Sequence, residues 1–146
     1  MRGFKEELIA QCGMNCGICT SYLAYINKVP KKKGGGGIHH CVGCRIKNSQ
    51  CVVKKRCISP KKKEIDFCFE CDVFPCDPLR KLDARYRKNY NMSEIDNLNE
   101  IKRSGMKKFL NSQYKKYKCP KCGGLICVHS KSGKCYKCDK VKSWKE

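Results

Sequence analysis

The chain has 146 residues, of which 15 are cysteines, and a formal net charge of +20. This share of cysteine is typical of a chain held together by disulfides or metal ions. Leu, Ile, Val and Phe number only 29, which leaves little material for an apolar core. These values exclude a large enzyme such as an eight-stranded α/β barrel of about 250 residues. They also exclude a membrane span, because no run approaches about 18 apolar residues.

The cysteines are better explained by metal ligation than by disulfides. The N-terminal sequence MRGFKEELIAQCG has no apolar segment of the kind found in secretory signals, so we expect a cytoplasmic protein in which thiols stay reduced. An odd number of cysteines also cannot pair completely within one chain. The alternative is an extracellular disulfide scaffold.

The distribution of cysteine predicts three regions. Residues 1–76 hold ten cysteines and form a Cys-rich metal-binding region, residues 77–118 hold none and form a helical segment packing on it, and residues 119–146 hold five and form a zinc ribbon. The expected fold class is a small metal-stabilised α+β protein, with a Cys-rich N-terminal domain, a short helical middle and a C-terminal ribbon.

Regular structure is sparse in the N-terminal region. Residues 16–27 predict a helix with Tyr22, Leu23 and Ile26 on one side. The basic stretches 28–37 and 54–63 predict exposed loops. We therefore expect metal ligation to organise this region.

The N-terminal region contains three Cys-x2-Cys pairs and four isolated cysteines. Such pairs are typical of zinc sites. One grouping with local spacing is Cys41, Cys44, Cys51 and Cys57. A second would draw on the six others, which are Cys12, Cys16, Cys19, Cys68, Cys71 and Cys76. Spacing alone does not determine the partition, and we leave His39 and His40 out of the ligand set.

The spacing Cys12-x3-Cys16-x2-Cys19 also occurs where radical S-adenosylmethionine enzymes bind a [4Fe–4S] cluster. Those enzymes need a long barrel around the cofactor, which 146 residues cannot supply. An iron–sulfur cluster of another kind stays open for this array, because all-thiolate sites suit both metals. The ferredoxin pattern C-x2-C-x2-C-x3-C-P is absent, so we expect zinc, with two to four ions in the whole chain.

The cysteine-free middle predicts three helices. The first has Asp77 as its N-cap and Pro78 at its first position. The second begins at Ser93, with Asp96 three residues later as a variant capping box, and ends at Gly105. The third runs from about residue 106 to 117.

The C-terminal region contains the most specific motif in the sequence. CPKC and CYKC are separated by twelve residues, a spacing at which two tight turns can surround one tetrahedral ion. The predicted zinc ligands are Cys119, Cys122, Cys135 and Cys138. A closed shell of four thiolates leaves no open position for catalysis. Residues 125–129 predict a strand, with Cys127 as a buried thiol and His129 as a surface imidazole.

Several of these motifs together resemble the family DUF3795, which comprises small Cys-rich proteins of archaea and anaerobic bacteria. They are CGMNCGICTSYLAY at 12–25, CVGC at 41–44, the spaced Cys51 and Cys57, and CFECDVFPCDPLRKLDARY at 68–86. The tail IDNLNEIKRSGMKKFLNSQ and its ribbon are similar to the C-terminal extension of many members. The glycine run at 34–37 departs from the pattern. The resemblance implies no activity, but it implies metal ligation by Cys12, Cys16, Cys19, Cys41, Cys44, Cys51, Cys57, Cys68, Cys71 and Cys76.

The charge predicts a polyanionic partner. Zinc ribbons and knuckles are common in RNA-binding proteins, and lysines gain affinity by releasing counterions from phosphates. The candidate contacts are Lys31, Lys32, Lys33, Lys54, Lys55, Arg56, Lys61, Lys62 and Lys63. We therefore expect a non-catalytic zinc-binding module for RNA or the ribosome, since no catalytic motif is present. The alternatives are an iron–sulfur protein for electron transfer or redox sensing, and a protein-interaction adaptor with purely structural metals.

Overall fold

The computed structural model describes residues 3–28, 40–45, 57, 64–129, 135 and 137–138, and this part of the chain is mostly helical. Its elements are η1 (Glu6–Leu8), η2 (Cys16–Ile18), α1 (Thr20–Ile26), η4 (Cys68–Glu70), α3 (Asp77–Tyr90), α4 (Glu94–Ser104) and α5 (Met106–Tyr117). Three isolated β-bridges join the pairs Ile9 and Asn15, Lys118 and Leu125, and Ile126 and Cys135. Within these described ranges there is no strand, so the expected α+β class is not confirmed. None of their helices is long and apolar enough to cross a bilayer.

The first predicted helix of the middle segment is confirmed as α3, with its start shifted by one residue. Cys76 occupies the N-cap, so Asp77 is the first helical residue rather than the cap, and Pro78 still lies in the first turn. Proline is tolerated there because the first-turn N–H groups have no partner within the helix. The helix ends at Asn91, which adopts the left-handed conformation with φ 51°, as asparagine can at helix ends.

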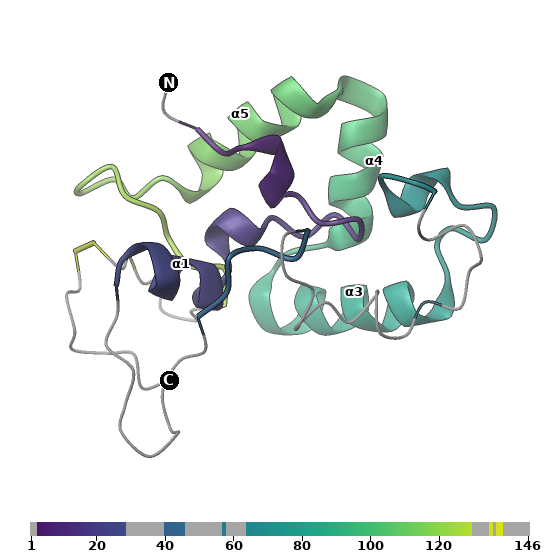
Figure 1. Ribbon diagram of the computed structural model, residues 1–146, viewed down its shortest axis with the longest axis horizontal. Helices are drawn as coiled ribbons and strands as arrows, with labels where there is room; N and C mark the ends of the chain where they lie inside the picture. Colours follow the sequence, from purple (N-terminus) through teal and green to yellow (C-terminus); the bar gives the residue numbers. More distant parts are fainter. Residues whose placement is uncertain are drawn as a thin grey trace, which may run out of the picture.

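The other two predicted helices are confirmed as α4 and α5. Ser93 caps α4, because its hydroxyl oxygen accepts a hydrogen bond from the Asp96 backbone N–H at 3.0 Å. Gly105 alone connects the two helices, with φ 88° and ψ 161°, a backbone conformation that is almost restricted to glycine. The sharp turn lets α4 pack against both α3 and α5, and Figure 1 shows the three helices in succession around the N-terminal segment.

The helix predicted over residues 16–27 forms as two pieces, the 3-10 turn η2 and the helix α1. Leu23 of α1 is buried as expected, whereas Ile26 is 47% exposed. The N-cap of η2 is Asn15, whose side-chain oxygen accepts a hydrogen bond from the Gly17 backbone N–H at 2.9 Å. The break between the two pieces lies at Cys19, whose extended backbone (φ −74°, ψ 138°) ends η2 and precedes α1.

The core lies between the N-terminal segment and the three long helices. Ile18, Leu79 and Leu98 are fully buried in one cluster, and Ile9 with Phe109 is fully buried in a second. Burying such side chains is worth about 1.5–3 kcal/mol each. The Cys-rich segment therefore contributes apolar residues as well as thiols, and the division at residues 76 and 118 stays a prediction.

Polar contacts fix the N-terminal segment onto α4 and α5. The Asn97 side-chain amide donates to the Gly13 carbonyl oxygen at 2.9 Å, and the Asn15 amide contacts Gln113 at 3.4 Å. Gly13 has φ +88°, and a Cβ atom there would lie 2.6 Å from the Glu94 carbonyl oxygen. Only glycine permits this close approach of the two backbones.

The C-terminal segment docks on the other side of the N-terminal segment, next to α1. The Val128 backbone N–H donates to the Ile18 carbonyl oxygen at 2.9 Å. The Thr20 hydroxyl contacts the Cys127 sulfur at 2.9 Å, and Cys127 also packs with Leu23. Residues 126–129 thus lie beside the first cysteine motif, more than a hundred positions away in the sequence.

Candidate metal centres

The four C-terminal cysteines predicted as zinc ligands come together. The sulfur atoms of Cys119, Cys122, Cys135 and Cys138 all lie within 4.8 Å of one another. The Cys119–Cys138 and Cys122–Cys135 sulfur distances are 3.7 and 3.5 Å. Tetrahedral zinc with Zn–S bonds of 2.3 Å requires sulfur separations of about 3.8 Å. The group could therefore hold a metal ion, and its dimensions suit a single one.

Local backbone geometry positions the first two of these thiols. The Cys119 N–H donates to the Gly124 carbonyl oxygen at 2.7 Å, and the Gly123 N–H donates to the Cys119 carbonyl oxygen at 3.0 Å. Gly123 has φ +73°, which makes glycine the favoured residue in this turn. The Gly124 N–H also donates to the Cys122 sulfur at 3.3 Å. The predicted tight turn after the first Cys-x2-Cys pair is therefore present.

The four thiols perturb one another's ionisation. Hydrogen bonds from the backbone of Cys122 and Lys121 lower the pKa of Cys119 to about 7. The pKa of Cys138 is raised, because its sulfur shares hydrogen bonds with Cys122 and Cys119. Four thiolates at this spacing repel one another, and a bound dication offsets that repulsion.

Five N-terminal cysteines line a second feature, a cavity of about 520 Å³. They are Cys12, Cys16, Cys19, Cys41 and Cys44. This differs from the grouping of Cys41 and Cys44 with Cys51 and Cys57 that sequence spacing favoured. Cys51 lies outside the described residues, whereas Cys57, Cys68, Cys71 and Cys76 are described but do not line the cavity.

The segment 40–45 reaches the cavity through contacts that span long stretches of sequence. The Cys44 backbone N–H donates to the Cys16 sulfur at 3.4 Å. The Cys41 N–H donates to the Ser21 carbonyl oxygen at 3.1 Å. Arg45 fastens the end of the segment, because its guanidinium donates to the Ile9 carbonyl oxygen at 2.6 Å. Sequence reasoning missed Arg45, since a lone arginine among many basic residues carries no signal.

His129 closes the cavity from the C-terminal segment. Its Nδ1 accepts a hydrogen bond from the Thr20 backbone N–H at 3.2 Å, so the neutral ring carries its proton on Nε2. That Nε2 lies 2.8 Å from the Tyr86 hydroxyl, to which it therefore donates. Burial, together with the nearby Arg85, lowers the pKa of His129 to about 4. The expectation of a surface imidazole is wrong, because both ring nitrogens are bonded inside the fold.

Glu94 forms part of the cavity wall at the start of α4. Its side chain is fully buried, with 0% exposure. Neither carboxyl oxygen has a hydrogen-bond partner among the described residues. Burial raises the pKa of this carboxyl to about 8, and the nearby Asp83 carboxylate adds to the effect. A buried polar group without a partner usually marks a ligand site or a strained one, and sequence reasoning missed it.

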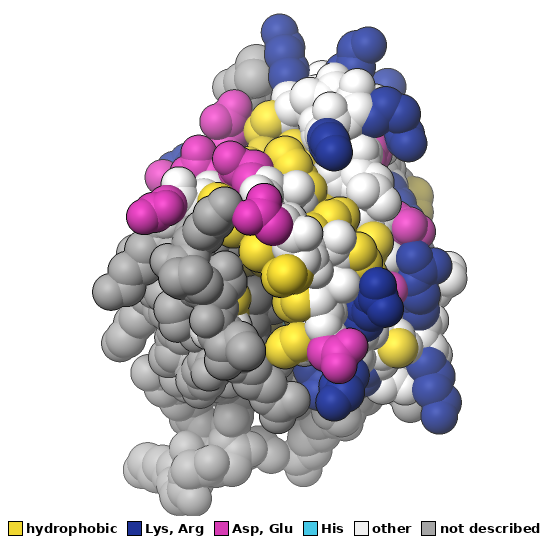
Figure 2. Space-filling view, turned by 90° about the vertical axis from the view of Figure 1, so that its right-hand side faces the viewer, with side chains coloured by type: hydrophobic (Ala, Val, Ile, Leu, Met, Phe, Trp, Pro, Cys, Tyr) yellow, Lys and Arg dark blue, Asp and Glu magenta, His cyan; other side chains and the backbone are white. Residues whose placement is uncertain are grey.

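The predicted nucleic-acid contacts have no structural counterpart here. Lys31, Lys32, Lys33, Lys54, Lys55, Arg56, Lys61, Lys62 and Lys63 all lie outside the described residues. Other basic side chains are exposed on the helices, and Lys107, Lys108, Lys115 and Lys116 lie on α5. Figure 2 shows Lys and Arg side chains at the top and along one side of the molecule, separated from a group of Asp and Glu by apolar side chains.

The comparison with known families agrees with the cysteine pattern. The family described as "Protein of unknown function (DUF3795)" matches residues 8–81, half of the chain. The match includes all five cysteines that line the cavity. No curated protein and no solved structure matches the chain. The chain belongs to the DUF3795 family, whose cysteine-rich part it joins to a C-terminal four-cysteine group that could bind a metal ion.

Proposed function

We propose that this protein is a non-catalytic zinc-binding protein that binds RNA. The observation that carries the metal assignment is the convergence of four cysteine sulfurs within 4.8 Å at the C-terminal site. All four ligands are thiolates, which suits Zn²⁺ in a closed, structural site. The proposed role of the ion is to hold residues 118–129 in the conformation that docks beside α1.

Metal content tests the zinc assignment. Protein purified with zinc in excess is expected to hold one zinc ion more per chain than the Cys119→Ser variant purified in the same way. Cys127→Ser is the matched control, because Cys127 is also buried in this segment but lies outside the four-sulfur group. Equal zinc content in the two variants would contradict the assignment.

RNA is proposed as the partner because of the charge on α5. This helix carries four exposed lysines and no acidic residue. Lys108, Ser112 and Lys115 recur at helical spacing on its solvent side, opposite the buried Phe109 and Tyr117. Two lysines and a serine on one helix face can contact phosphates without reading bases.

Binding of the full chain to a fluorescent single-stranded RNA tests the partner. Because about 0.7 counterions are released per phosphate contact on single strands, the double variant Lys108→Glu/Lys115→Glu is expected to weaken binding and flatten its salt dependence. The control Lys81→Glu/Lys88→Glu makes the same charge change on exposed positions of α3. Equal losses in the two variants, or no binding by the native chain, would contradict the RNA proposal and favour a protein adaptor.

A further inference from the structure

The cysteine-lined cavity is separate from the C-terminal four-cysteine group. Its thiols come from two places, the motif 12–19 and the segment 41–44, and helices α3 and α4 supply the opposite wall. Five cysteines around one cavity of about 520 Å³ exceed what packing needs, since a buried structural cysteine only has to fill space.

The spacing of these sulfurs differs from that of the C-terminal group. Among the described residues, the C-terminal cysteines are the one set of three or more potential ligands whose atoms all lie within 4.8 Å of one another. The sulfur atoms of the cavity cysteines are therefore more widely separated than those of the C-terminal group. A single tetrahedral ion draws its thiolates to about 3.8 Å from one another, whereas an iron–sulfur cluster lies between its ligands and spreads them apart.

The other wall residues suit a buried anionic cluster. Leu82, Tyr86 and Tyr90 contribute apolar surface to the cavity wall, and the surroundings of an iron–sulfur centre help to set its potential. Arg85 supplies a positive charge at the wall. The Cys44 and Gly43 backbone N–H groups already donate to the sulfurs of Cys16 and Cys41, each at 3.4 Å.

Glu94 is the independent sign that the cavity takes a ligand. Its carboxyl group is fully buried, lines the cavity and lacks a hydrogen-bond partner among the described residues. Leaving a buried polar group unsatisfied costs about 1–3 kcal/mol. Because this side chain lines the cavity, a ligand bound there would lie where the missing partner is needed.

We propose that this cavity binds an iron–sulfur cluster held by Cys12, Cys16 and Cys19, with a fourth thiolate from Cys41 or Cys44. The inference goes beyond the proposed function, because it concerns a different set of thiols and a different cofactor. It also accounts for the arrangement of the five cysteines around one cavity.

Anaerobic reconstitution of the full chain tests the proposal. The protein, holding one equivalent of zinc, is incubated with ferric iron, sulfide and a thiol reductant, which supplies the electrons that reduce part of the iron, and is then desalted. Iron, acid-labile sulfide, zinc and visible absorption are measured on the same sample. The native chain is expected to retain iron and sulfide in equal amounts and to absorb in the visible, while Cys16→Ser and Cys19→Ser lose both signals.

Two comparisons separate loss of the cluster from loss of the fold. Cys71→Ser changes a cysteine of the same region that does not line the cavity, and it is expected to keep the cluster. Zinc content that stays at the native level shows that the C-terminal site, and with it the proposed zinc function, survives in each variant. Iron without sulfide, added zinc in place of iron, or equal losses in Cys71→Ser and Cys16→Ser would overturn the proposal.

Discussion

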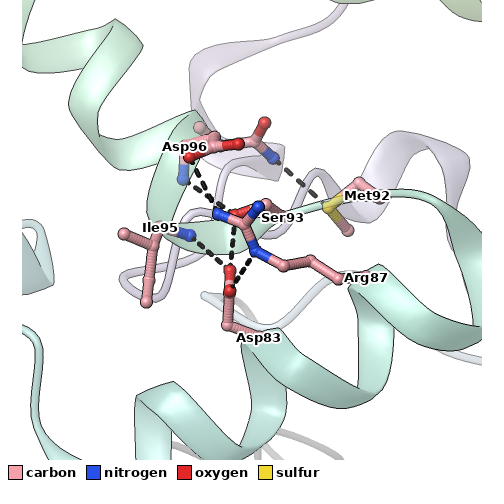
Figure 3. Close-up of polar contacts among 7 residues, drawn as sticks. Asp83, Arg87, Met92, Ser93, Ile95 and Asp96 are labelled. Carbon is pink, nitrogen blue, oxygen red and sulfur yellow. Dashed lines mark hydrogen bonds and ion pairs between the residues drawn. The ribbon is translucent and has the colours of Figure 1, made fainter.

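Asp83 is the residue on which the junction between α3 and α4 depends. Its carboxylate accepts hydrogen bonds from the Ser93 hydroxyl, the Ile95 backbone N–H and the Arg87 guanidinium (Figure 3). The first two partners belong to the first turn of α4, and Arg87 also reaches Asp96 at 3.0 Å. Asp83 therefore links the middle of α3 to the N-terminal cap of α4.

We expect Asp83→Asn to lower the free energy of unfolding by about 1–3 kcal/mol, because a nearly buried carboxylate loses charge-assisted hydrogen bonds. Chemical denaturation at neutral pH measures this change. The control is Asp96→Asn, since that carboxylate is exposed and should contribute less than about 1 kcal/mol. Equal effects of the two substitutions would contradict the role given to Asp83.

The difference between the native chain and Asp83→Asn should also depend on pH. Partial burial opposes ionisation of Asp83, but the hydrogen bonds from Ser93, Ile95 and Arg87 outweigh it, and the pKa is lowered from 3.8. A lowered pKa adds stability that is complete above the unfolded value and is lost as pH falls through the folded value. The stability difference should therefore stay constant near neutral pH and shrink only below about pH 3.8.

Alanine substitutions at two glycines are expected to separate the cost of backbone strain from the cost of steric overlap. Gly13 and Gly105 both have φ +88°, but a Cβ atom at Gly13 would meet the Glu94 carbonyl oxygen, whereas nothing lies within 4 Å at Gly105. Gly105→Ala should cost about 1–3 kcal/mol from backbone strain alone. Gly13→Ala should cost more, because α4 must also move. Equal melting temperatures for the two variants would contradict this account.

At the scale of elements, backbone bridges connect the four-cysteine group to residues 126–129, the segment that packs beside α1. Lys118 and Leu125 form an isolated bridge, as do Ile126 and Cys135. The Ile126 N–H donates to the Tyr117 carbonyl oxygen at 2.7 Å, at the end of α5. The ligands therefore hold the ends of the segment that carries Cys127 and His129 to α1.

We expect Cys119→Ser to release this segment while the helices α3, α4 and α5 stay folded. Loss of one thiolate weakens the metal site, and the Val128 and Thr20 amides then lose the hydrogen bonds that they make to Ile18 and His129. Hydrogen exchange of those two amides should accelerate, whereas the Ile101 amide in α4 serves as the internal reference. Unchanged protection of Val128 would show that the segment docks without the metal.

For the whole molecule, we expect metal binding to add to the stability that the small core provides. The fully buried side chains include Phe109, Ile18, Leu79 and Leu98, which join the N-terminal segment to the long helices. This core is real but modest for a chain of 146 residues. We therefore expect a metal ion that binds only the folded state to contribute a large part of the net stability.

Removal of metal by a strong chelator should lower the melting temperature by about 10 °C. A ligand at a hundred times its dissociation constant contributes about 3 kcal/mol, and each kcal/mol shifts the transition of a chain this size by about 2–4 °C. Calorimetry with and without chelator measures the shift, and equimolar zinc should restore it. An unchanged melting curve would contradict metal stabilisation.

The sequence by itself determined the elements whose signals are local. Ser93 and Gly105 mark the ends of α4 because capping involves residues within one turn of the chain. The Cys-x2-Cys pairs near residues 119 and 135 predicted their own convergence, since each pair turns on itself. The family membership likewise follows from cysteine spacing in residues 8–81.

Only the tertiary structure decided which cysteines share the cavity and what surrounds them. Cys44 meets Cys16 across 28 positions, and Thr20 meets His129 across 109. The residues adjacent in the sequence do not predict such contacts, because packing of the whole core brings these distant segments together. Glu94 illustrates the same point, since acidic residues are common in the first turn of a helix, and only the tertiary structure shows that this one is fully buried beside the cysteine-lined cavity.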